Sequence, residues 1–138
     1  MRSSINYLFG RFYMSNGNVV GWFEIYVSDM PRAMKFYETV FQFGEFTDFS
    51  FDGEQLMGFP SVEGAAHDAG ALVESGGWTP GKGGTTVYFN SDDCAVEENR
   101  ALAAGGKVYR PKHAVGEHGF VCILEDTEGN MIGIHSSQ

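Results

Sequence analysis

The stretch GWFEIYVSDMPRAMKFYETVF, residues 21–41, reads as a β-strand followed at once by an amphipathic α-helix. Aromatic and β-branched residues predict a strand over 21–27, and Ser28-Asp29 is a pair that can cap a helix. After this cap, apolar residues recur at the spacing of one helical stripe: Ala33, Phe36, Tyr37, Val40 and Phe41. Gly44 then ends the unit.

A second, diverged copy of this unit begins 64 residues later, where Thr86 matches Trp22. A strand at 85–91 is followed by the cap pair Asp92-Asp93 and by a helix that ends at Gly105-Gly106. Each helix precedes three strand-like runs, predicted at 45–51, 54–59 and 69–74, and again at 107–110, 119–125 and 130–135. Strand, helix and three strands, repeated twice, predict an α+β fold built by internal duplication.

The chain of 138 residues is long enough for one domain and too short for two. We expect a single domain at 19–138, preceded by an N-terminal extension at 1–18 in which Met14 is the expected native start. The expected boundaries within the domain are module one at 19–75, a glycine-rich linker at 76–83 and module two at 84–137.

The charge balance narrows the range of partners. The net charge is −9 with only nine Lys and Arg, so nucleic acid and anionic membranes are not expected partners, because both need a cationic face. Cys94 and Cys122 lack the spacing of a redox pair, and no secretory leader is recognisable, which predicts core thiols in a reducing, cytoplasmic compartment.

Period-two alternation separates two faces of the first and last strands of the repeat. One face is aliphatic or aromatic and suits packing under a helix: Phe23, Ile25, Val27, Val87, Phe89, Ile132 and Ile134. The other mixes polar and aromatic side chains, which make a poor core and a good pocket. We therefore predict a small-molecule cavity with Glu24 and His135 as catalytic candidates and a ligand-binding set of Trp22, Tyr26, Thr86, Tyr88, Asn90 and Met131.

Glu24 and His135 could each have a structural role instead of a functional one. Glu24 is flanked by aromatic residues and suits a general base acting beside a carbonyl, but it could equally be satisfied by a nearby donor or lie exposed at an edge. His135, close to the C-terminus, either contributes to the pocket or merely fills space. His67, His113 and His118 fall in loops, where solvated surface is the default.

Three segments in order resemble the vicinal oxygen chelate superfamily, which includes glyoxalase I, bleomycin-resistance proteins and extradiol dioxygenases. They are FEIYVSDMPRAMKFYETVF (23–41), GTTVYFNSDD (84–93) and DTEGNMIGIHS (126–136). The resemblance implies two βαβββ modules in tandem, a curled mixed sheet around a cavity, and a homodimer. It also implies a divalent metal as candidate cofactor, held by residues of the first and last strands.

The family's metal-ligand positions fall here on Trp22, Thr86 and Gly133, with a fourth inside 70–73, and none is a usual ligand. Glu24 and His135 stand two residues further along and are the remaining metal candidates. The resemblance therefore implies a glyoxalase-like lyase or isomerase acting on a carbonyl compound, with or without a metal. The alternative is a metal-free binding or resistance protein that sequesters an aromatic or cationic small molecule.

Overall fold

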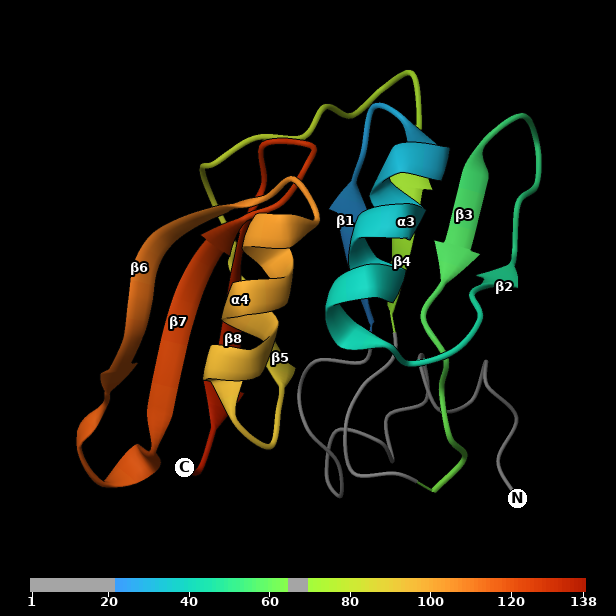
Figure 1. The fold of residues 1–138 in the computed structure, drawn as a ribbon. Helices are drawn as coiled ribbons and strands as arrows, with labels where there is room; N and C mark the ends of the chain where they lie inside the picture. The colour runs from blue at the N-terminus through green and yellow to red at the C-terminus, as the bar shows by residue number, and fades with distance from the viewer. Residues whose placement is uncertain (1–21, 65–69) are drawn as a thin grey trace.

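The computed structural model describes residues 22–64 and 70–138, and it consists of two four-stranded mixed sheets with one helix on each (Figure 1). The extension predicted at 1–18 lies outside the described residues. The first sheet has the order β1 (Phe23–Tyr26), β4 (Gly70–Glu74), β3 (Gln55–Gly58) and β2 (Thr47–Asp48). The second has the order β5 (Val87–Asn90), β8 (Met131–Ser136), β7 (Phe120–Glu125) and β6 (Lys107–Ala114).

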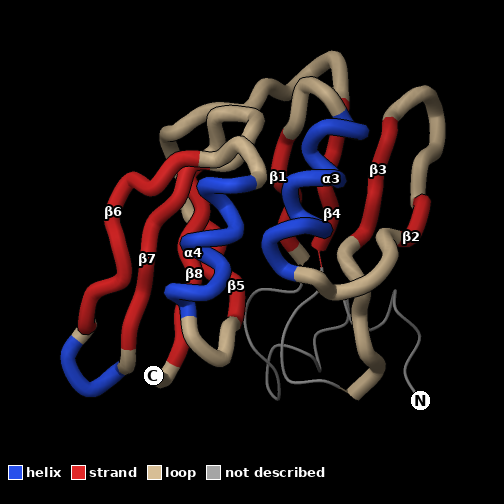
Figure 2. Tube along the Cα trace, viewed as in Figure 1, coloured by secondary structure: helices blue, strands red, loops and turns tan. Residues whose placement is uncertain are grey.

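The two halves repeat one topology, which confirms the predicted tandem βαβββ fold. In each sheet the first strand of the module pairs in parallel with the last, and the other pairs are antiparallel. The helices α3 (Met30–Phe41) and α4 (Cys94–Ala103) cover the same face of the molecule (Figure 2). A short 3₁₀ helix, η1 (Gly116–His118), joins β6 to β7, and neither described α-helix is long and apolar enough to cross a membrane.

The strands predicted at 21–27 and 85–91 are each shorter, at Phe23–Tyr26 and Val87–Asn90, and two others differ more, for identifiable reasons. The run expected at 45–51 shrinks to a two-residue β2, because the Asp48 carboxylate accepts the amide of Ser50 at 2.8 Å and turns the chain. The run expected at 107–110 extends to Ala114 as β6. This strand lies at the sheet edge and contains register shifts, so it tolerates Pro111, which cannot donate a ladder hydrogen bond.

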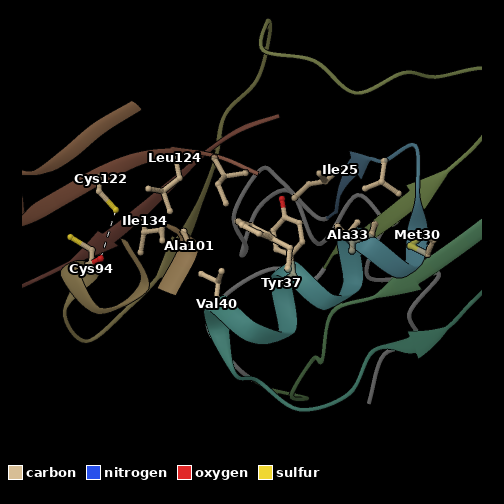
Figure 3. Close-up of a cluster of buried hydrophobic side chains, with 14 residues drawn as sticks. Ile25, Met30, Ala33, Tyr37, Val40, Cys94, Ala101, Cys122, Leu124 and Ile134 are labelled. Atoms are coloured by element: carbon tan, nitrogen blue, oxygen red, sulfur yellow. Dashed lines mark hydrogen bonds between the residues drawn. The ribbon is translucent and has the colours of Figure 1, made fainter. Parts of the chain in front are cut away.

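The predicted caps and the apolar face are confirmed. The side chains of Asp29 and Asp93 accept backbone amides at the starts of α3 and α4. The predicted apolar residues of the first and last strands of the repeat pack with both helices into one core (Figure 3). Cys94 and Cys122 are buried, free thiols of this core, and burial raises the pKa of Cys122 to about 12.

A turn of module two is fixed on the start of helix α3, in module one. We call this contact the module clasp; its residues are Asp126, Glu128 and Asn130 on one side and Ser28, Asp29, Arg32 and Tyr37 on the other. Gly129, at φ +86°, permits the turn. The residues in contact are separated by about 90 to 100 positions in the sequence, so these are tertiary contacts between the two halves of the duplication.

Glu128 makes the largest number of clasp contacts. Its side chain is 0% exposed, and its Oε1 accepts the backbone amides of Ser28 and Asp29, both at 3.0 Å. Arg32 donates from Nε to Oε2 at 2.6 Å and from Nη2 to Oε1 at 2.9 Å. Burial alone would raise the pKa of Glu128, but the hydrogen bonds from Arg32, Ser28 and Thr127 outweigh it and lower the pKa to about 2.

Asp126 forms the buried part of the clasp. It is 3% exposed and accepts the hydroxyl of Tyr37 at 2.7 Å as well as the backbone amides of Glu128 and Asn130, each at 2.8 Å. Burial raises the pKa of Asp126, and the hydrogen bonds from Tyr37 and Asn130 oppose that rise. Burial and the neighbouring Asp126 charge also raise the pKa of Tyr37 well above its ordinary value.

We expect Glu128→Gln to lower the free energy of unfolding by about 2–4 kcal/mol at pH 7, because it removes the buried negative charge that accepts Arg32 and two backbone amides. The folded pKa of about 2 lies below the ordinary 4.5, so the carboxylate stabilises the fold fully above pH 4.5 and progressively less down to pH 2. The difference between the wild type and the variant in urea unfolding should therefore be smaller at pH 3 than at pH 5, and the two should converge only near pH 2. Glu38→Gln, on the exposed side of α3, is the control, and an equal deficit at both pH values would contradict the assignment.

Candidate functional site

A cavity of about 680 Å³ lies at the seam where the two modules meet. We call it the seam cavity. It is bounded by β1 of module one, by β5 and β8 of module two, and by the linker between the modules. The described residues that line it are Trp22, Phe23, Glu24, Ile25, Tyr26, Thr79, Pro80, Gly81, Gly83, Thr85, Val87, Asn130, Met131 and Ile132.

Glu24 lies on the cavity wall between two aromatic donors. The indole Nε1 of Trp22 donates to Oε2 at 3.3 Å, and the phenol of Tyr26 donates to Oε1 at 3.1 Å. Alternation along β1 places the three side chains on one face of the strand, as the sequence predicts. Partial burial, the hydrogen bond to Glu24 and the negative charge of Glu24 raise the pKa of Tyr26. The phenol is therefore protonated at neutral pH and donates its hydrogen to the carboxylate.

Trp78 packs against this wall from the linker side, although the described lining of the cavity does not include it. Its ring stacks on Tyr26 with centroids 5.6 Å apart and planes inclined by 20°, while 61% of the residue stays exposed. We call Trp22, Tyr26 and Trp78 the aromatic wall. Sequence reasoning missed Trp78, because it lies in the glycine-rich connection far from β1. The available signal was that the chain contains only two tryptophans.

Asn130 connects the linker, β1 and the module clasp. Its Oδ1 accepts the amide of Gly81 at 2.9 Å, and its Nδ2 donates to the carbonyl of Tyr26 at 2.8 Å and to Asp126 at 3.1 Å. Lys82 adds an ion pair to Glu125 at 2.8 Å. The linker is thus fixed over the cavity from module two, by an asparagine that was quoted for the family resemblance but was not among the predicted site residues.

The predicted site residues divide into two groups. Trp22, Glu24, Tyr26 and Met131 line the seam cavity, whereas the described lining does not include Thr86, Tyr88, Asn90 or His135. At β5 the lining consists of Thr85 and Val87 instead. The Nε2 atom of His135 lies 2.6 Å from the carbonyl oxygen of His118, so this ring is engaged by the η1 turn, away from the wall that carries Glu24.

The residues present do not fit the metal site of the family. At Gly133 any side chain would collide with the ring of Tyr88, its register partner on β5. Trp22 donates its indole N–H to Glu24, and residues 70–73 are glycine and aliphatic residues. Within 22–64 and 70–138, no group of three or more His, Cys, Asp or Glu side chains is arranged to hold a metal ion.

The comparisons with known proteins agree with this architecture. The family model of the glyoxalase/bleomycin resistance protein/dioxygenase superfamily matches residues 19–134, so the chain belongs to this superfamily. No curated protein sequence matches the chain.

Solved structures with a similar fold include both ligand-binding proteins and enzymes. TnmS3, an antibiotic-binding protein from Streptomyces sp. CB03234, is 24% identical with a TM-score of 0.66, covering 89% of this chain and 98% of that one. A glyoxalase/bleomycin resistance protein from Albidiferax ferrireducens T118 is 17% identical, with a TM-score of 0.63 and coverage of 86% and 98%. Glyoxalase I from Zea mays is 18% identical, with a TM-score of 0.68 over 83% of this chain and 43% of that chain.

The lack of fit to a metal leads to a direct test. We expect Ni²⁺, Zn²⁺, Mn²⁺ and Fe²⁺ at neutral pH to leave the Tm of the purified protein unchanged within about 1 °C, since a ligand bound by the folded state alone would raise it. A clear rise that disappears in both Glu24→Ala and His135→Ala would contradict this and would reveal a metal site displaced from the family's usual positions.

Proposed function

We propose that this chain binds a flat aromatic small molecule in the seam cavity and needs no metal ion to do so. The observation that carries the proposal is the aromatic wall, in which Trp22 and Tyr26 hold Glu24 and Trp78 stacks on Tyr26. Exposed indole and phenol rings offer large, rigid apolar faces at low entropic cost, and stacking on such faces adds about 0.5–1.5 kcal/mol per ring pair.

The size and lining of the seam cavity suit a drug-sized ligand. Its volume of about 680 Å³ falls within the range of roughly 300–1,000 Å³ that is common for small-molecule pockets. Trp22, Tyr26 and Met131 give it apolar and aromatic surface, and a few polar groups such as Asn130 stand at its rim. This combination of apolar surface with few convergent polar groups is typical of ligand sites.

The geometry favours binding over the predicted lyase or isomerase reaction. Proton transfer by an acid–base pair requires both groups within reach of one substrate, and only Glu24 lies on the described cavity wall. The antibiotic-binding role of TnmS3 supports the binding alternative by fold analogy. The homodimer and the cytoplasmic location remain predictions from the sequence.

Tryptophan fluorescence tests the proposal directly, because both tryptophans of the chain belong to the aromatic wall. We expect acridine to quench the emission saturably with a stoichiometry of one per chain. Tyr26→Ala should weaken this binding about tenfold, since one stacking face and the support of Trp78 are lost.

The matched control is Tyr109→Ala, which removes a phenol that is 69% exposed on β6, away from the cavity. Saturable quenching that is equally affected by both variants, or no saturable quenching of the wild type by either acridine or its cationic analogue 10-methylacridinium, would overturn the proposed function.

A further inference from the structure

The aromatic wall surrounds one carboxylate, and no cation of the described residues shares its cavity. Among the described lining residues, Glu24 is the only carboxylate, and there is no lysine, arginine or histidine. Lys82 lies on the nearby linker, but its ammonium group is paired with Glu125 at 2.8 Å. The two groups that hold Glu24, the indole N–H and the phenol, are neutral donors and leave its charge uncompensated.

A second carboxylate adds to the same negative field. Glu54 accepts the hydroxyl of Ser75 at 2.9 Å and lies near enough to Tyr26 for its charge to contribute to the raised pKa of that phenol. The faces of the wall are electron-rich as well, because an aromatic ring presents the negative end of its quadrupole. Carboxylate and rings therefore favour positive charge at the same place.

Filling the cavity changes the energetics of Glu24. In the free protein Glu24 is exposed and hydrated. A flat ligand lying on Trp22 and Tyr26 would remove water from this carboxylate, and an unpaired charge withdrawn from water among apolar groups is costly. A neutral ligand does nothing to offset this desolvation cost. A cation offsets it by pairing with Glu24 and by cation–π contact with the rings.

We propose that the natural ligand of the seam cavity is an aromatic organic cation, with Glu24 as its counter-ion, Trp22 and Tyr26 as its stacking surfaces, and Trp78 supporting the ring of Tyr26. This inference rests on the proposed function and names the ligand class. Glu24 is then a specificity-determining residue, which selects for positive charge by penalising neutral ligands of the same shape.

Two probes of nearly equal shape test the inference: 10-methylacridinium, a permanent cation, and acridine, which is neutral at pH 8. We expect the wild type to bind the cation at least about tenfold more tightly. In Glu24→Gln, which keeps the size and an acceptor for Trp22 and Tyr26, this preference should fall to less than about threefold. Acridine itself should bind the variant as tightly as the wild type, or more tightly, because an uncompensated charge has been removed.

Glu38→Gln is the matched control, because it makes the same change in net charge on the outer side of α3 and should leave the preference intact. Equal affinities for the two probes in the wild type, or a preference that survives Glu24→Gln, would overturn the inference while leaving aromatic binding established. Failure of both probes to bind any variant would overturn the proposed function together with the inference.

Discussion

The buried carboxylate of Glu128 is the constraint on which the seam between the modules depends. It comes from the turn before β8, yet it accepts the amides of Ser28 and Asp29 and the guanidinium of Arg32 at the start of α3. The start of an α-helix presents free N–H groups and the positive end of the dipole, so an anion from the opposite module is well placed there. Glu74 of β4 accepts the amide of Met30 at 2.7 Å and completes this arrangement.

With the modules fixed in this way, the seam is closed on the side of the helices and open on the opposite side. β1 and β5 are both edge strands, and the structure gives them no ladder with one another. On the helix side, aromatic rings close the gap: Phe41 lies 4.4 Å from Phe89 between centroids, and Phe23 lies 6.4 Å from the same ring. On the opposite side the gap remains open as the seam cavity, whose rim residue Asn130 belongs to the same turn as Glu128. Module geometry and cavity shape therefore depend on one short segment.

Local patterns in the sequence predict the fold well. Strand alternation and the caps Asp29 and Asp93 depend on neighbouring residues only, and the repeat at a spacing of 64 residues predicted the duplicated topology. The site was predicted in part. Glu24 and its aromatic flanks lie on one face of one strand, so periodicity places them together. Trp78, by contrast, stacks on Tyr26 from the linker, and Asn130 lines the cavity from the clasp. Such contacts depend on how two modules dock, which no local pattern encodes.

The central claim is that a ligand occupies the seam between the modules beside the aromatic wall. The most direct measurement is a ¹H–¹⁵N correlation spectrum during titration with 10-methylacridinium, in which the side chains of Trp22 and Trp78 give the chain's two indole resonances. The account predicts that both indole signals, and the amides of Tyr26 and Gly81, shift and saturate with one binding constant. Saturable shifts confined to other parts of the chain, with both indole signals unmoved, would contradict it.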